Sequence, residues 1–215
     1  SMWFAEDPKI QSVLMAWQGG IEGGAAAAEL LCGIGSPSGK LADTFAKTLE
    51  DYPSSYNFHE SQDYVDYTDD IYVGYRYFTT FRKKAAYPFG YGLSYTEFCI
   101  RQENIRFDGE VLELDVYVKN VGEKAGKEVV QVYYSAPQGK LGKPAKELCA
   151  YVKTNKLAPS ESQTVDIEFA VKDMASYDDS GVTGNKSCYV LEAGDYAIYV
   201  GNSVRNVKEV LTYNV

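Results

Sequence analysis

Hydrophobic and polar residues alternate regularly in the second half of the chain. Between Leu112 and Val118 every second residue is aliphatic, a period of two that is typical of a strand with one face in water. Four further runs with strand character, separated by clusters of Gly, Pro, Asn and Ser, lie at 129–134, 148–153, 165–171 and 196–200. Several short strands at this spacing predict an all-β, immunoglobulin-like sandwich over 97–215.

The beginning of the chain has a pattern typical of α/β structure. Residues 13–17 form a continuous apolar run that ends at Gly19 and Gly20, as expected for a parallel strand covered on both faces. An alanine-rich run at 25–31 follows and ends at Gly33, which predicts a helix stopped by a C-terminal glycine. Strand, glycine turn and helix together make half of a βαβ unit.

This half unit is not self-sufficient. A strand covered on both faces needs neighbouring strands, and the few residues before position 13 do not supply them. We therefore interpret 1–96 as a portion of an α/β domain, followed by the sandwich over 97–215 as a second domain. Residues 1–60 are expected to expose apolar strand edges, which favours homo-oligomers or partial disorder, whereas the sandwich is expected to be stable by itself.

The stretch between these two patterns is rich in tyrosines and turn residues. It runs from 35 to 96 with tyrosines dense between 64 and 95, and no Pro/Ser-rich linker follows it. We therefore expect an ordered, irregular segment packed at the junction of the two halves. Arg76 lies among aromatic residues at 72–78, an arrangement suited to stacking or to holding a carboxylate. We interpret this segment as a packing seam in which Arg76 pairs with a nearby acid.

The overall charge excludes two classes of partner. Acidic residues number 30 against 21 basic residues, the formal net charge is −9, and no basic cluster stands out. Such a field repels phosphate backbones and anionic lipids, and no apolar run approaches the ~20 residues of a membrane helix. Neither nucleic acid nor a membrane is expected as a partner. No signal peptide is recognisable near the start, which favours a cytoplasmic location.

The cysteines and the single histidine give no support for a metal or a cofactor. The cysteines stand far apart in apolar or strand-like settings, at Cys32, Cys99, Cys149 and Cys188. We expect them to be buried free thiols. His59 alone cannot build a His-rich metal site, and the chain has no G-x-S-x-G motif for a Ser-His-Asp triad.

Acidic residues in the first half are candidates for hydrolytic chemistry. Hydrolysis by paired carboxylates needs two carboxyl groups facing each other at about 5 to 9.5 Å. The candidates are Glu22, Asp63, Asp66, Asp69 and Asp70. Acidic residues in polar loops are usually only solvated, and we favour that interpretation. The glycine-rich segment 19–24 could cradle a phosphate, but it lacks the spacing of a phosphate-loop motif, so we interpret it as a tight turn before a helix.

Several strings in this order and spacing resemble glycoside hydrolase family 3, of the multidomain β-glucosidase type. The strings at 13–24, 37–41 and 51–53 are similar to the later part of that family's α/β-sandwich domain. The strings YVGYRY at 72–77 and PFGYGLSYT at 88–96 resemble its C-terminal signature. Those at 118–122, 128–133, 146–148 and 194–196 resemble the fibronectin type III-like module attached to many members.

The resemblance implies an activity whose catalytic residues lie elsewhere. Members of the family hydrolyse β-linked glucosides, and some hydrolyse xylosides, with retention through a covalent glycosyl-enzyme. In the enzymes it resembles, the nucleophilic Asp lies on a (β/α)8 barrel and the Glu acid/base in an upstream part of the α/β domain. Neither position can be matched here, so the resemblance implies no catalytic, cofactor-binding or metal-binding residue in this chain. A β-glucoside or oligosaccharide substrate would bind through other domains of the parent enzyme.

Three functions stay open at this point. The first is a non-catalytic fragment of a retaining β-glucosidase-like enzyme, in which the sandwich supports the α/β domain. The second is a carbohydrate-binding or adhesion module without hydrolytic activity, whose tyrosines would stack on sugars. The third, a complete small hydrolase, needs a carboxylate pair that the sequence does not show. The lack of partner strands for 13–17 favours the first.

Overall fold

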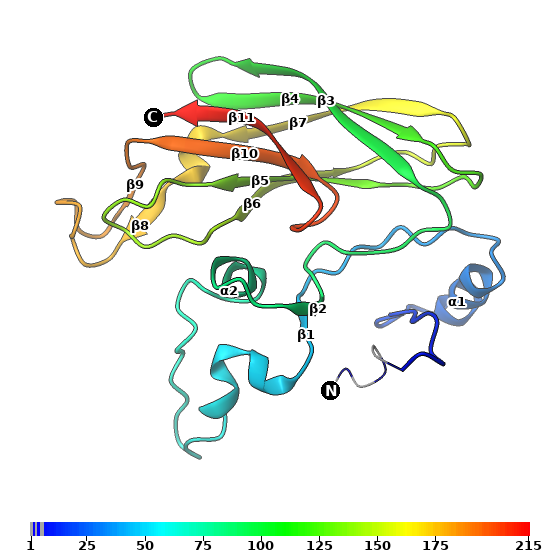
Figure 1. Ribbon diagram of the computed structural model, residues 1–215, viewed down its shortest axis with the longest axis horizontal. Coiled ribbons are helices and arrows are strands. Elements are labelled where there is room, and N and C mark those ends of the chain that lie inside the picture. The colour runs from blue at the N-terminus through cyan, green and yellow to red at the C-terminus, as the bar shows by residue number, and fades with distance from the viewer. Residues whose placement is uncertain (1, 3, 5–6) are drawn as a thin grey trace.

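The second half of the chain is a sandwich of two antiparallel sheets (Figure 1). The computed structural model describes residues 2, 4 and 7–215. One sheet has the order β3-β4-β7 and consists of Phe98–Phe107, Val111–Asn120 and Ser162–Ala170. The other has the order β11-β10-β5-β6, with β5 at Val129–Ser135, β6 at Glu147–Lys153, β10 at Asp195–Gly201 and β11 at Val207–Asn214.

The core between the sheets follows from the alternation seen in the sequence. Val116 and Val118 of β4 are fully buried, and the residues between the inward positions of β4 are half-buried. Ile167 of β7 lies in the same cluster, and Val132 and Ile198 enter it from the facing sheet. Burying each such side chain stabilises the fold by about 1.5 to 3 kcal/mol. The predicted sandwich is confirmed.

The five strands predicted for the sandwich are all present, whereas the edge strands β3 and β11 were not predicted. Each of them pairs on one side only. The pairing of β3 with β4 shifts register between Gln102 and Asn104, and that of β10 with β11 shifts between Ile198 and Tyr199. Such bulges break the period of two, so alternation alone does not reveal these strands. A short hairpin of β8 (Ser176–Asp178) and β9 (Cys188–Val190) follows a 3-10 helix at Val171–Met174.

The helix predicted at 25–31 is present as α1, Gly23–Leu31. At its end the amide of Ile34 donates to the carbonyl of Glu29 (2.9 Å) and that of Gly33 donates to Leu30 (3.0 Å). This is the Schellman arrangement of a helix C-terminus. Gly33 has a φ of 72°, a left-handed conformation that glycine adopts at little cost. The predicted C-terminal glycine is therefore confirmed.

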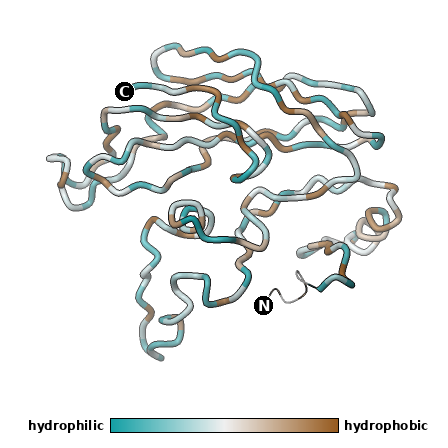
Figure 2. The backbone as a smooth tube through the Cα atoms, in the orientation of Figure 1, coloured by the Kyte–Doolittle hydropathy of each residue, from teal (hydrophilic) through white to brown (hydrophobic). Residues whose placement is uncertain are grey.

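The buried parallel strand predicted at 13–17 is wrong. These residues belong to no strand, and Leu14 and Trp17 are 40% and 64% exposed. All strand pairs among the described residues are antiparallel, and none of them places a strand beside this run. Helix α1 likewise buries none of its residues, although Figure 2 shows hydrophobic residues along it. The apolar exposure expected for 1–60 is thus present in the described part of that range.

The remaining elements form a small layer against the sandwich. They are the pair β1 (Phe45–Ala46) and β2 (Ala85–Tyr87), the 3-10 helices η2 (Leu49–Asp51) and η3 (Pro53–Tyr56), and α2 (Tyr75–Thr80). Their own core consists of Ala46, Phe78 and Ala85. Tyr52 packs edge-on against Phe78 with ring centroids 5.8 Å apart. No helix in the described part of the chain is long and apolar enough to cross a membrane.

The four cysteines are free, but the prediction that they are buried is wrong for two of them. Cys32 and Cys99 are exposed, whereas Cys149 and Cys188 are half-buried. Cys32 ends α1, a helix without a covering layer, and Cys99 lies on the outer face of the edge strand β3. Burial raises the pKa of the Cys149 thiol to about 12.

Candidate functional site

The two halves meet along a continuous set of contacts, which we call the junction seam. It consists of the residues of 72–80 and 88–96 that touch the sandwich. Tyr75, at the start of α2, stacks on Phe89 with ring centroids 4.6 Å apart and meets Tyr133 of β5 edge-on at 6.1 Å. The Tyr75 hydroxyl accepts a hydrogen bond from the amide of Leu148 in β6 (2.9 Å). The expected packed junction is therefore present.

Polar pairs of the junction seam fix the orientation of α2 on the sandwich. Arg76 Nε lies 3.7 Å from Glu147 Oε2, which confirms the prediction that Arg76 pairs with a nearby acid. Four residues later, Thr80 Oγ1 accepts a hydrogen bond from the amide of Ala145 (2.9 Å). Because these side chains come from one face of a short helix, they hold that face towards the strand β6 and the loop before it.

Gln131 of β5 joins three segments at the centre of the junction seam. Its Nε2 donates to the carbonyls of Asn202 (2.9 Å) and Gly90 (3.3 Å). Its Oε1 accepts from the hydroxyl of Tyr133 (2.5 Å). Burial raises the pKa of Tyr133 far above its ordinary value of 10.0, so this hydroxyl remains a donor. A buried amide with all these partners fixes the signature segment 88–96 in one position.

A second buried polar contact ties the segment 37–41 to the sandwich. Lys40 Nζ lies 2.7 Å from Glu128 Oε1, and the two side chains are 13% and 7% exposed. The other oxygen of Glu128 accepts from Asn202 Nδ2 (3.1 Å). Glu128 and Glu97 line a cleft of about 290 Å³. Because both oxygens of Glu128 are already occupied, this cleft does not present a free carboxylate pair for hydrolysis.

The candidate carboxylates of the first half do not come together. Glu22 begins α1, on one side of the structure, whereas Asp63, Asp66, Asp69 and Asp70 lie on the loop between η3 and α2, on the opposite side (Figure 1). Asp63, Asp66 and Asp70 are exposed, and Asp69 is half-buried. Glu22 makes no side-chain cap at α1. The solvated-loop interpretation agrees with this placement, while the prediction that the chain holds no catalytic residue stays a prediction.

The glycine turn and His59 also occupy peripheral positions. Residues 19–24 form the turn before α1, and the amide of Gly23 donates to the carbonyl of Gly20 (2.9 Å), as expected for a tight turn. His59 is exposed and contacts Phe58 edge-on at 4.6 Å. Among the residues that the structure describes, no group of three or more His, Cys, Asp or Glu side chains is arranged to hold a metal ion.

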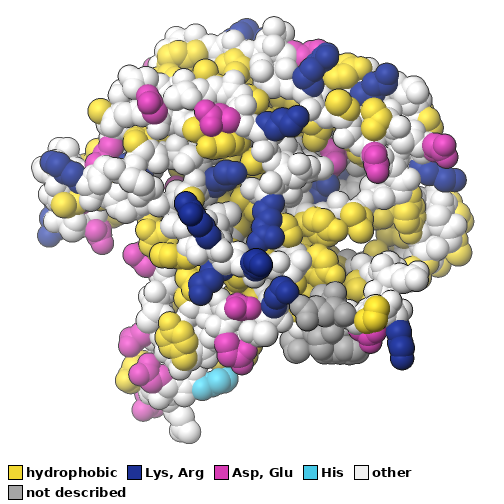
Figure 3. Space-filling model, in the orientation of Figure 1, with side chains coloured by type: hydrophobic (Ala, Val, Ile, Leu, Met, Phe, Trp, Pro, Cys, Tyr) yellow, Lys and Arg dark blue, Asp and Glu magenta, His cyan; other side chains and the backbone are white. Residues whose placement is uncertain are grey.

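The larger cleft of the structure lies beside α2 and was not predicted. It has a volume of about 470 Å³, and its lining includes five cations, Arg82, Lys83, Lys84, Lys146 and Arg205, and no acidic residue. Figure 3 shows Lys and Arg side chains gathered where α2 meets the sandwich. The expectation of no basic cluster is therefore wrong. The signal in the sequence was the run 82–84, which stayed inconspicuous because the other two cations are distant in the chain.

Comparisons with known proteins define the class to which this arrangement belongs. Residues 1–95 match the family model of the glycosyl hydrolase family 3 C-terminal domain, and residues 128–204 match that of the fibronectin type III-like domain. The chain is thus the pairing of these two modules that modular glycoside hydrolases carry. It belongs to glycoside hydrolase family 3.

Individual relatives support the assignment over the whole chain. Beta-glucosidase A of Butyrivibrio fibrisolvens is 54% identical over 96% of the chain, and a beta-glucosidase of Ruminococcus albus is 50% identical over all of it. A beta-glucosidase structure from Paenibacillus barengoltzii superposes with a TM-score of 0.89 at 52% identity, over 93% of the chain and 23% of its own length. The chain spans 27% and 22% of the two curated relatives.

The close approach of Gly92 to the segment 37–41 gives a test of the junction seam. A Cβ at Gly92 would lie 2.3 Å from the carbonyl oxygen of Gly39, a backbone atom that cannot move alone. Gly92→Ala is therefore expected to detach 37–41 and to cost about 1 to 3 kcal/mol. Limited trypsin digestion should cut faster within 40–47 while the β-sheet circular dichroism stays unchanged.

The matched control for this substitution is Gly39→Ala. A Cβ at Gly39 would meet nothing within 4 Å, although the residue lies on the other side of the same contact. Digestion of Gly39→Ala at the rate of the unsubstituted chain is expected. Equal digestion rates for Gly92→Ala and Gly39→Ala would contradict the contact.

Proposed function

We propose that this chain is the non-catalytic part of a retaining β-glucosidase, in which the sandwich holds one edge of the α/β domain in place through the junction seam. The observation that carries the proposal is the identity of 54% and 50% with two beta-glucosidases over nearly the whole chain. The parent enzyme would hydrolyse terminal β-linked glucose, or a related sugar, through a glycosyl-enzyme intermediate.

The placement of the carboxylates supports the non-catalytic part of the proposal. Retaining hydrolysis needs two carboxyl groups about 5 to 5.5 Å apart on either side of the scissile bond. The larger cleft is lined by cations, and Glu128 in the smaller cleft is engaged by Lys40. Substrate would accordingly bind through parts of the parent enzyme outside these residues. None of the comparisons supports the alternative of a free-standing carbohydrate-binding or adhesion module.

Hydrolysis of an aryl β-glucoside tests the proposal. The purified chain is expected to give no turnover above buffer, whereas a longer protein that joins it to a family 3 barrel and a complete α/β domain should be active. The control is the same long protein with its barrel nucleophile replaced. Turnover by the 215-residue chain that disappears in Glu22→Gln, or on neutralising the acids of 63–70, would contradict the proposal.

A further inference from the structure

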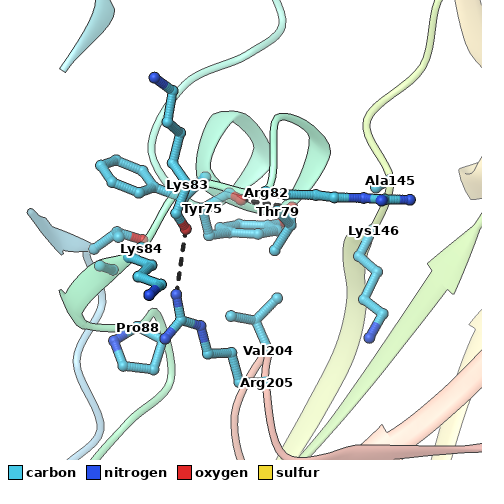
Figure 4. A pocket seen from close by; sticks show the side chains of 13 residues that line it. Tyr75, Thr79, Arg82, Lys83, Lys84, Pro88, Ala145, Lys146, Val204 and Arg205 are labelled. Atoms are coloured by element: carbon cyan, nitrogen blue, oxygen red, sulfur yellow. Dashed lines mark hydrogen bonds between the residues drawn. The ribbon is translucent and has the colours of Figure 1, made fainter. Parts of the chain in front are cut away.

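The larger cleft combines charge from four separate segments. Arg82, Lys83 and Lys84 follow the end of α2, Lys146 precedes β6, and Arg205 lies in the turn between β10 and β11. Figure 4 shows Lys84, Arg205 and Lys146 reaching into the space beside α2, whereas Lys83 points away from it. A favourable contact with the carbonyl end of α2 explains the run 82–84, but it does not explain why Lys146 and Arg205 lie opposite that run.

The cations of this cleft lack the carboxylate partners that cations elsewhere in the chain have. Lys40, Arg76, Arg106 and Lys143 each form an ion pair with a Glu or an Asp. Within the described part of the chain, no such pair involves a cation of the cleft. Arg205 donates to the carbonyl of Lys83 (3.3 Å), and Lys146 Nζ lies 4.5 Å from the centre of the Tyr199 ring. In a chain of net charge −9, this concentration of uncompensated positive charge points to an anionic ligand.

A buried hydroxyl at the edge of the same cleft has no hydrogen-bond partner. Thr44 lines the cleft, is 2% exposed, and its Oγ1 has none in the structure. Leaving a buried polar group unpaired costs about 1 to 3 kcal/mol. The backbone of Thr44 is fixed by Asp43, which accepts from its amide (3.1 Å), and by the hydroxyl of Tyr52, which donates to its carbonyl (2.8 Å). The Thr44 hydroxyl is therefore held in place and free to donate to a ligand.

Arg82 occupies a position that favours glycine. The amide of Lys83 donates to Phe78 (2.9 Å) and that of Arg82 to Thr79 (3.4 Å), so α2 ends in a Schellman arrangement with Arg82 at the left-handed position. Its φ is 53°. A non-glycine residue there costs about 1 to 2 kcal/mol. Retaining an arginine where glycine would be more stable is consistent with a use for its charge.

We propose that the cleft binds a phosphate group, carried either by inorganic phosphate or by a small phosphate ester. A phosphate presents three or four oxygens and up to two negative charges, which matches two guanidinium groups, several ammonium groups and one hydroxyl better than a single carboxylate does. The volume of about 470 Å³ lies in the range of small-molecule sites, about 300 to 1,000 Å³. It leaves room for an organic group attached to the phosphate.

Titration calorimetry on the 215-residue chain tests the proposal with defined probes. Inorganic phosphate, glucose 6-phosphate and glucose are titrated at constant ionic strength. Saturable binding of phosphate or glucose 6-phosphate, with no binding of glucose, is expected. Tighter binding of the ester would identify a phosphate ester as the ligand, and equal binding would identify the free ion. Weak binding of both that disappears when chloride replaces buffer anions, or tighter binding of succinate than of phosphate, would overturn the proposal.

Substitutions that do not endanger the fold locate the site. Arg205→Gln and Lys146→Gln are each expected to weaken phosphate binding about 10-fold or more, whereas Arg101→Gln, an exposed arginine on β3, should leave it unchanged. Thr44→Val and Arg82→Gly should weaken binding without lowering the melting temperature, because they remove an unpaired hydroxyl and a strained residue. Unchanged phosphate affinity in Arg205→Gln and Thr44→Val would refute the site.

Discussion

Replacing Asn120 by aspartate is expected to lower the free energy of unfolding of the sandwich by about 4 kcal/mol. Asn120 ends β4, is fully buried, and uses both ends of its amide. Its Oδ1 accepts from Thr96 Oγ1 (2.6 Å) and from the amide of Gly122 (3.1 Å), while its Nδ2 donates to the carbonyls of Lys124 (2.7 Å) and Leu157 (3.0 Å). Aspartate would place a buried negative charge against those two carbonyls.

Urea unfolding followed by circular dichroism measures this effect, and its pH dependence identifies the cause. A buried carboxyl group with repelling neighbours has a raised pKa in the folded state. The loss of stability should therefore grow as pH rises above about 4, the ordinary aspartate value, and shrink in acid, where a protonated carboxyl can again donate. Asn155→Asp is the matched control, because Asn155 is exposed in a neighbouring turn. A loss below about 1 kcal/mol in Asn120→Asp would show that the amide is not needed.

The second large effect is expected at Glu192, the partner of a fully buried lysine. Lys143 Nζ lies 2.7 Å from Glu192 Oε2, and the lysine side chain is 1% exposed. Lys143 also donates to the carbonyl of Pro137 (2.8 Å). Glu192→Gln would leave this ammonium group without a compensating charge, and the expected loss of unfolding free energy is on the order of 3 kcal/mol. Glu113→Gln removes one partner of the exposed Arg106 and should cost less than about 1 kcal/mol.

The pH dependence of this pair has a defined sign. Burial by itself raises the pKa of Glu192, but hydrogen bonds from Lys143, Lys140 and Leu141 outweigh it and hold the pKa below its ordinary value of 4.5. The unfolded chain thus binds the proton first as pH falls, so the stabilisation is fully present above about pH 4.5 and is lost below it. Melting temperatures of the unsubstituted chain and of Glu192→Gln should accordingly converge in acid. A constant difference from pH 7 to pH 3 would contradict an ionic contribution.

The sequence predicted those parts of the fold whose local pattern agrees with their tertiary setting. Strand β4 is visible because its inward residues face one core along the whole strand, and α1 is visible because Gly33 ends it. Strand β3 escaped detection because its register shift between Gln102 and Asn104 places polar residues where the alternation requires apolar ones. The run 13–17 has the composition of a buried strand, but a strand needs partners, and composition does not report their absence.

For the sites, the sequence predicted residue types but not proximity. Arg76 was expected to meet an acid because an arginine among aromatic residues is unlikely to stay unpaired, although Glu147 could not be named. The cationic cleft was missed because Lys146 and Arg205 join the run 82–84 only through the packing of α2 on the sandwich. Charge patterns that depend on chain topology are not visible in a linear sequence.

The distribution of thiols makes the junction seam directly observable in solution. Cys32 is exposed on the first unit and Cys99 on the sandwich, whereas burial suppresses the reactivity of Cys149. After replacement of the half-buried Cys188 by serine, a donor and an acceptor dye on Cys32 and Cys99 would place one fluorophore on each unit. Energy transfer between them would then follow the movement of one unit relative to the other, molecule by molecule.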